Sequence, residues 1–185
     1  DGCASLDEAL ARVRVAEVAP GRWLRGYGWR DGDWDPRVEP TKEALDAVTG
    51  GTPTIMISKD YHSAWLNSAA LAAASGELEV PGGVVERDER GEATGVLREE
   101  SAWRFRDRYV LTTEDEWVES TRAGIRLANA RGVTAIHDKD GWLGAPGIFQ
   151  RLRAEGNLSL RVWGSIPHGL LDDAAALSLR SGFGD

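Results

Sequence analysis

The sequence predicts an α/β protein whose two halves are organised differently. The second half alternates helical periodicity with short apolar strands, which is typical of a parallel sheet covered by helices. The first half carries short strands, a hairpin and small helices, which indicates an α+β arrangement. We expect two parts, over residues 1–112 and 113–185. A chain of 185 residues can form one domain with a core or a large piece of a bigger one.

Composition narrows the classes of partner. The net charge of −8 argues against a nucleic-acid backbone as partner, since that surface selects basic patches. The single cysteine, Cys3, excludes an intramolecular disulfide and suggests a reducing compartment. The sequence lacks an apolar run of the roughly 20 residues that a bilayer-spanning helix needs. We therefore expect a cytoplasmic protein that binds neither nucleic acid nor membrane.

Capping and turn residues define the elements of the first 58 residues. Ser5 and Glu8 form a capping box, which starts a helix that Pro20 and Gly21 stop. An aromatic strand with alternating glycines follows, and glycine there suggests close approach of another backbone. The expected elements are a helix from residue 6, a strand over 23–29, a helix over 41–48 and a strand over 54–57.

The middle of the chain predicts a helix, a hairpin and a second helix. The Ala-rich run after residue 62 favours a helix, and a polar turn over 89–92 joins two strands. The expected elements are a helix over 63–74, strands over 84–88 and 93–99, and a helix over 101–109.

In the second half, Thr113 and Glu116 form another capping box at the start of the longest helix. Nearly all-apolar runs, which indicate buried strands, then alternate with helical segments. The expected elements are a helix over 113–130, a strand over 133–138, a helix over 146–155, a strand over 158–166 and a helix over 172–181.

Asp60, His62 and Asn67 stand out because they follow a strand directly. In open α/β sheets and barrels, ligands bind at the carboxyl ends of the strands, so these residue types at that place suggest a site. The alternative is ordinary helix capping. Eight tryptophans, spread from Trp23 to Trp163, also suggest surfaces that line a ligand or an interface.

Several segments, in order along the chain, resemble family three of the metal-dependent amidohydrolases, the branch that includes N-substituted formamide deformylase-like enzymes. The segment Asp60-Tyr61-His62-Ser63-Ala64-Trp65-Leu66-Asn67-Ser68-Ala69-Ala70-Leu71 is close to that family's Asp-Gly-His-x-x-Trp-Val-Asn-Ser-x-Ala-Leu. The other similar segments are residues 23–29, 40–48, 81–83, 91–99 and 132–138.

This resemblance implies a (β/α)₈ barrel of the amidohydrolase type with an inserted α+β subdomain. It also implies an enzyme that hydrolyses non-peptide, amide-like C–N bonds of small molecules, using water activated by a divalent metal, zinc. The chain departs from the family's pattern because it has no His-x-His, and its three histidines, His62, His137 and His168, are far apart.

The departure predicts an internal fragment, inactive alone, whose metal ligands lie outside it. We expect no metal in this chain by itself, the remainder of the barrel as its partner, and a possible homodimer through exposed strand edges.

The resemblance and the strand ends together suggest site residues. His62 could donate a hydrogen bond or relay a proton, and Glu99 and His137 follow strands, although a solvated helix start and a core histidine are the ordinary readings of these two. We assign His62, Glu99 and His137 as catalytic, and Trp29, Asp60, Trp65, Asn67 and Asp138 as substrate-binding. The rival hypothesis is a non-catalytic ligand-binding or lid module with a tryptophan-rich surface.

Overall fold

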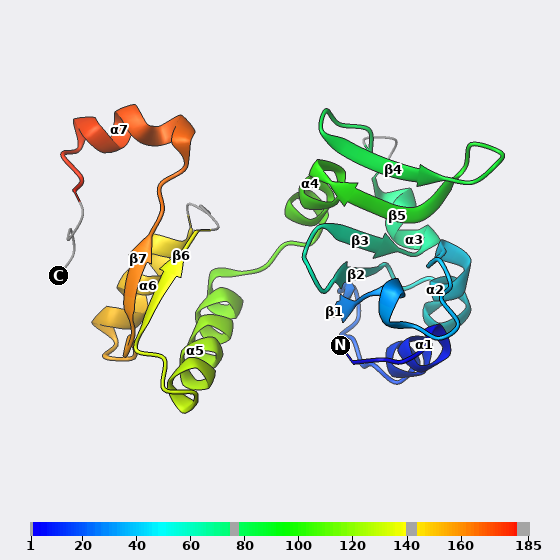
Figure 1. The fold of residues 1–185 in the computed structure, drawn as a ribbon, viewed down its shortest axis with the longest axis horizontal. Coiled ribbons are helices and arrows are strands. Elements are labelled where there is room, and N and C mark those ends of the chain that lie inside the picture. The colour runs from blue at the N-terminus through cyan, green and yellow to red at the C-terminus, as the bar shows by residue number, and fades with distance from the viewer. Residues whose placement is uncertain (1, 75–77, 140–143, 181–185) are drawn as a thin grey trace. The chain divides into compact units, whose positions relative to one another are not determined.

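A computed structural model describes residues 2–74, 78–139 and 144–180 of the chain (Figure 1). The backbone contacts divide it into two compact units, Asp1–Leu111 and Thr112–Asp185. Each unit has its own core and is described by itself. Over the parts of the chain that the structure describes, none of the helices combines the length and the apolar character needed to cross a membrane.

Unit 1 is built on a five-stranded mixed sheet with the order β1-β2-β3-β5-β4. β1 and β2 are parallel, and every other neighbouring pair is antiparallel. Its elements are α1 (Leu6–Arg14), β1 (Leu24–Trp29), η1 (Asp31–Asp33), α2 (Lys42–Thr49), β2 (Thr54–Ser58), β3 (Ser63–Leu66), α3 (Ser68–Ala73), β4 (Gly83–Arg87), β5 (Ala93–Glu99) and α4 (Glu100–Tyr109).

Helices cover both faces of this sheet. The apolar cluster on one face joins side chains of β2, β3 and β5 to α3 and α4: Ile55, Ile57, Ala64, Leu66, Ala70, Leu97, Ala102 and Phe105. The cluster on the other face joins the sheet to α1 and α2: Ala9, Val13, Leu24, Trp29, Leu45, Trp65 and Val96. Alternate residues of a strand point to opposite faces, which is why Ala64 and Trp65 belong to different clusters.

β3 corrects the helix expected over residues 63–74. Ser63–Leu66 is a strand that pairs with β2 on one side and with β5 on the other (Figure 1). All four of its residues are buried, because the strand is covered on both faces as well as flanked on both edges. A helix does follow, but only from Ser68 to Ala73. Asp60 and His62 therefore lie in the turn of a β-hairpin instead of at the start of a helix.

Asn67 connects three elements at the end of β3. Its side-chain Oδ1 accepts hydrogen bonds from the backbone N–H of Ala70 at 2.9 Å, which caps α3, and of Thr54 at 3.0 Å, the first residue of β2. Its Nδ2 donates to Thr49 Oγ1 at 3.0 Å and to the Thr52 carbonyl at 2.9 Å. The side chain is fully buried, so this amide is an internal brace of unit 1.

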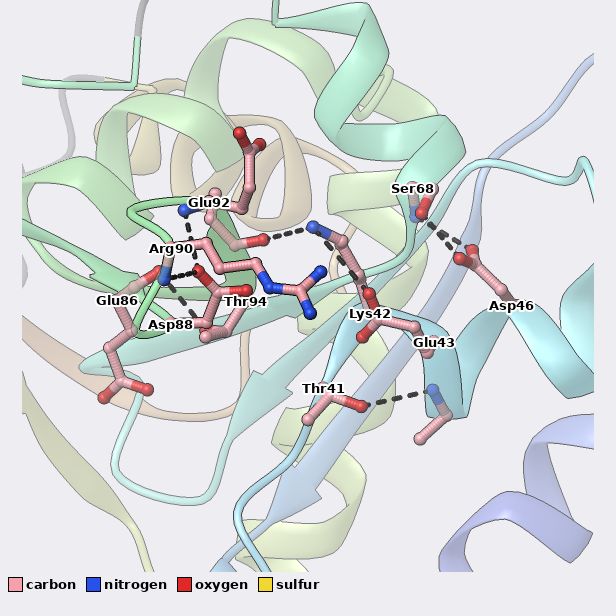
Figure 2. A network of polar contacts seen from close by, with 12 residues as sticks. Thr41, Lys42, Glu43, Asp46, Ser68, Glu86, Asp88, Arg90, Glu92 and Thr94 are labelled. Atoms are coloured by element: carbon pink, nitrogen blue, oxygen red, sulfur yellow. Dashed lines mark hydrogen bonds and ion pairs between the residues drawn. The ribbon is translucent and has the colours of Figure 1, made fainter.

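The start of α2 lies against β5 at Gly95. The φ angle of Gly95 is +106°, and a Cβ there would lie 2.6 Å from the Leu66 carbonyl oxygen and 3.0 Å from the Lys42 nitrogen. Only glycine fits this backbone. Around it, Lys42 Nζ donates to the Ala93 carbonyl at 2.6 Å, and Asp46 accepts from the backbone N–H of Ser68 at 2.9 Å (Figure 2).

Unit 2 repeats a helix–strand pattern. Its elements are α5 (Glu114–Ala130), β6 (Ala135–Asp138), α6 (Ala145–Ala154), β7 (Arg161–Gly164), η2 (His168–Leu170) and α7 (Leu171–Ala176). β6 and β7 are parallel, which agrees with the predicted βαβ pattern. The predicted end of the last helix, at residue 181, lies outside the described residues.

The strands of unit 2 are covered on one face. Val118, Ile125, Ile148, Leu152 and Leu160 form the core between the helices and the strands, with Ile136 packed against it. On the other face Ala135, His137, Arg161 and Trp163 are exposed within this chain. The expectation of fully buried strands is therefore wrong for the chain by itself. Two strands show the alternating α/β repeat, but not a barrel.

Candidate functional site

The register of β3 with β5 brings His62 and Glu99 together. Ser63, the first residue of β3, pairs with Arg98 of β5, so the hairpin turn before β3 lies beside the last residue of β5. The Glu99 backbone N–H donates to the His62 carbonyl at 2.8 Å, which extends the ladder by one bond. Two residues 37 positions apart in sequence are thereby neighbours at one end of the sheet.

The side chains of this pair also bond to each other. His62 Nδ1 lies 2.8 Å from Glu99 Oε2, and the two side chains are 53% and 46% exposed. The hydrogen bond from Glu99 raises the pKa of His62, and the negative charge of Glu99 adds to it, as does that of Asp60 more weakly. The pair therefore favours a positively charged imidazole that is open to solvent.

The backbone around the pair is held in an uncommon conformation. Tyr61 has φ +65° and Glu99 has φ +54°, in the left-handed region that side chains other than glycine rarely adopt. Such conformations cost roughly 1–3 kcal/mol each and are maintained only where surrounding contacts impose them. Here the Tyr61 carbonyl accepts from the indole Nε1 of Trp103 at 2.9 Å, and the Trp103 ring meets the His62 ring edge-on at 5.3 Å between centroids.

Asp60 shapes the same turn. One of its carboxylate oxygens, Oδ1, accepts from Ser58 Oγ at 2.6 Å and from the His62 backbone N–H at 3.0 Å. These two bonds lower the pKa of Asp60, with the Ser58 bond the larger cause. The Asp60 carboxylate thus fixes the hairpin from which His62 projects.

Three residues expected at a substrate are instead part of the interior of unit 1. Trp65 and Asn67 have no exposed surface, and Trp29 is 6% exposed. The indole N–H of Trp65 donates to the Thr41 carbonyl at 2.8 Å, and that of Trp29 donates to the Met56 carbonyl at 2.7 Å. Trp65 and Asn67 have core and capping roles, so we remove both from the candidate site.

Trp29 does line a pocket of about 190 Å³ between α1 and β1. Trp34, Tyr27 and Met56 share its wall, together with the arginine side chains of Arg12, Arg25 and Arg30. The Trp29 ring packs against Trp34 and Trp65 with centroids 6.4 and 6.0 Å apart, so its main contacts are aromatic neighbours in the core.

His137 and Asp138 belong to unit 2, at the carboxyl end of β6. The His137 ring stacks on Trp163, its cross-strand partner in β7, with centroids 6.0 Å apart and planes 13° apart. His137 is exposed on the uncovered face of the two strands, and the core-histidine alternative does not apply to this chain. The structure joins His62 to Glu99, whereas His137 and Asp138 form a separate group.

Trp103 and Tyr61 are the members of the site that the sequence did not suggest. Glu99 directly precedes α4, and Trp103 follows it by four positions, which is the spacing that puts two side chains on one side of a helix. That spacing indicates that Glu99 and Trp103 are neighbours. It does not indicate that His62 lies beside them, because that depends on the β3–β5 register.

Metal ligation does not fit the side chains that the structure describes. Within residues 2–74, 78–139 and 144–180, no three His, Cys, Asp or Glu side chains gather as a metal ion would require. His62 and Glu99 form a pair only, since the carboxylate of Asp60 is directed to Ser58 and to backbone.

Comparison with known proteins shows which family this chain is similar to. The chain is 28% identical over 167 residues to the N-substituted formamide deformylase of Arthrobacter pascens, covering 84% of this chain and 30% of that protein. Its fold is similar to that of an uncharacterized metal-dependent hydrolase from Pyrococcus horikoshii OT3, with a TM-score of 0.64 and 23% identity over 96% of this chain and 34% of the other.

A second uncharacterized metal-dependent hydrolase, from Pyrococcus furiosus, gives a TM-score of 0.62 at 23% identity, covering 96% of this chain and 35% of its own. The chain spans about a third of the length of each of these three proteins. The model of the amidohydrolase family matches residues 1–185. The chain therefore belongs to the amidohydrolase family.

Proposed function

We propose that this chain is a segment of a hydrolase that cleaves carbon–nitrogen bonds, other than peptide bonds, in small amide-like molecules. Membership of the amidohydrolase family supports the reaction class. A relative named N-substituted formamide deformylase supports an amide-like substrate. The observation that carries the proposal is the His62–Glu99 pair, an exposed imidazole bonded at 2.8 Å to a carboxylate.

The His62–Glu99 pair is suited to binding the substrate and to transferring a proton to it. A protonated imidazole can donate a hydrogen bond to a carbonyl oxygen or hand a proton to a nitrogen, and both are needed when an amide is cleaved. His62 is held by a hairpin turn and Glu99 by the end of a strand, so neither depends on a long loop for its position. Polar groups fixed on rigid elements orient a substrate well.

His137 and Asp138 form a second candidate group in the proposal. Both stand where β6 ends, and barrel enzymes of parallel strands keep their active residues at that end. We propose that β6 and β7 are two strands of a (β/α)₈ barrel, and that the residues before them, 1–112, are a first helix and the inserted α+β subdomain. The exposed side chains of His137 and Trp163 support this, because they lie on a strand face that is uncovered in unit 2 and that would face the interior of a complete barrel.

The divalent metal of the whole enzyme, for which we propose zinc, would be held by residues outside this chain. The described side chains offer no site of three or more ligands, as noted above. The contribution proposed for this chain is thus confined to substrate binding, orientation and proton transfer by its own residues.

The experiment that tests the proposed function uses the full-length protein and a panel of amides and formamides. We expect hydrolysis of at least one class, and we expect His62→Ala to lower kcat/KM by about 100-fold, the lower range for loss of a positioned acid–base group. Bound metal should stay at the wild-type stoichiometry.

His168→Ala is the matched control, since His168 is an exposed histidine in η2 of unit 2. Loss of metal from the His62 variant, or equal losses of activity in both variants, would contradict the role given to His62. Absence of hydrolysis across the panel would contradict the reaction class.

A further inference from the structure

Two side chains contact the His62 ring, Glu99 at Nδ1 and Trp103 through its indole ring. Nδ1 is bonded to Glu99, and the ring meets Trp103 in an edge-on contact. The backbone on both sides is fixed as well, since the His62 N–H donates to Asp60 and the His62 carbonyl accepts from Glu99. Within the described part of the chain, no hydrogen-bond partner reaches Nε2, the other ring nitrogen.

These contacts determine which nitrogen can react. An ionised carboxylate only accepts hydrogen bonds, so Nδ1 carries a hydrogen and donates it to Glu99 in both charge states of the ring. Nε2 is then the nitrogen that gains and loses the second proton. The charged groups closest to the ring, Glu99 from β5 and Asp60 from the hairpin, are both acidic, which favours the protonated form.

Resting on the proposed function, we propose that His62 is the acid that protonates the leaving nitrogen of the substrate through Nε2, with Trp103 as its positioning residue. The step follows addition of water to the amide carbon, in which that water loses one proton to solvent and a tetrahedral anion is formed. The C–N bond then breaks as the oxyanion re-forms the carbonyl, the electron pair of the bond goes to nitrogen, and that nitrogen takes the proton from Nε2. The products are a carboxylic acid and an amine. His62 is left neutral and regains one proton from solvent, which replaces the proton that the attacking water released.

The chemistry of amides makes such an acid valuable. An alkylamide anion is a very poor leaving group, so cleavage requires a proton on nitrogen as the bond breaks. A nitroanilide leaves far more readily, because its nitrogen spreads the charge into the ring. The acid should therefore matter greatly for one substrate and little for the other, and this contrast separates proton donation from simple binding.

Trp103 serves the acid by holding the turn. Its indole N–H donates to the Tyr61 carbonyl at 2.9 Å, which helps to maintain the left-handed φ of +65° at Tyr61. Its ring also packs against the imidazole in a T-shaped contact, with centroids 5.3 Å apart. Without the indole bond the turn can relax, and relaxation lengthens the contact between His62 and Glu99.

The first experiment compares an N-alkylamide and a nitroanilide of the same acyl group in the full-length protein. In His62→Gln we expect kcat/KM to fall about 100-fold or more for the alkylamide, and by less than about threefold for the nitroanilide. Equal losses for both substrates would overturn the acid role while leaving the proposed function intact. A wild-type protein that cleaves neither substrate would instead overturn the proposed function, and the acid role with it.

The second experiment tests Trp103 through the protonation of His62. Trp103→Phe keeps an aromatic ring but removes the N–H, and we expect the pKa of His62, followed by NMR of the imidazole, to move down toward its ordinary value. The control is Trp23→Phe, a half-buried tryptophan of the same unit that packs on Phe105 and Tyr109. An unchanged pKa in Trp103→Phe, or an equal change in both variants, would overturn the positioning role.

Discussion

Replacement of Asn67 by alanine tests whether this buried amide is a brace or a substrate contact. The side chain of Asn67 satisfies the backbone N–H groups of Thr54 and Ala70, and it donates to Thr49 and to the Thr52 carbonyl. Alanine keeps the backbone but provides none of these partners. Because the site is fully buried, water is poorly placed to replace them.

The expected cost follows from the number of orphaned groups. Each buried N–H left without an acceptor costs about 1–3 kcal/mol, and two are created, at Thr54 and Ala70. We therefore expect Asn67→Ala to lower the free energy of unfolding of unit 1 by about 3 kcal/mol or more. The matched control is Thr41→Ala, which removes the cap of α2, a single bond of 3.3 Å, and should cost about 1 kcal/mol.

Urea unfolding followed by tryptophan fluorescence measures both variants. The buried indoles Trp29, Trp34 and Trp65 all lie in unit 1 and report on its unfolding. We expect the midpoint to fall with little change in slope, since the surface exposed on unfolding is nearly the same. An Asn67→Ala midpoint no lower than that of Thr41→Ala would refute the reasoning, and a normal midpoint with lost substrate binding would restore Asn67 to the site.

Three further outcomes are expected. Gly95→Ala should destabilise unit 1 far more than Gly91→Ala, because both glycines have positive φ but only at Gly95 would a Cβ strike a carbonyl, that of Leu66; equal urea midpoints would contradict this. Glu99→Gln should lower the free energy of unfolding most at about pH 5.5 and least at about pH 8.5. The raised pKa of His62 in the folded state stabilises the protein below the unfolded value of about 6.5, and this stabilisation is lost as the pH rises through the folded value. A destabilisation that grows toward pH 8.5 would contradict this reasoning. Elemental analysis of the purified 185-residue chain should find no stoichiometric zinc, and one retained equivalent would show that the chain has a metal site of its own.

Local signals predicted most helix starts well. The Thr113–Glu116 capping box forms in both directions: the Glu116 carboxylate accepts from the Thr113 N–H at 2.8 Å, and the Thr113 hydroxyl accepts from the Glu116 N–H at 3.2 Å. At the first helix Ser5 caps as expected, but the Glu8 carboxylate accepts from Ala4 instead of Ser5. Such motifs are readable because all their partners lie within one turn.

β3 was mispredicted because its stability comes from distant partners. Ala64 and Trp65 are followed by further alanines, which favour a helix locally, and a fully buried strand lacks the alternation that marks an exposed one. Pairing with β2 and β5 on both edges outweighs that local preference. The true start of the helix is set by Asn67, five residues later than we expected.

The candidate site was predicted in part for the same reason. His62 and Glu99 were each suggested by their place after a strand, but their bond depends on a register between segments 37 residues apart. The burial of Trp65 and Asn67 likewise depends on helices packed over both faces of the sheet. Residue type and local spacing identified the candidates, whereas only the tertiary arrangement distinguished the structural residues Trp65 and Asn67 from the exposed pair His62 and Glu99.

The enclosure of β3 has a consequence for motion at His62. A strand bonded on both edges and covered on both faces exchanges its amide protons only when the whole unit opens, so its backbone is fixed on timescales up to that of global unfolding. His62 directly precedes this strand, and its half-exposed ring is held by Glu99 and Trp103. The imidazole can therefore meet solvent while the backbone next to it stays fixed.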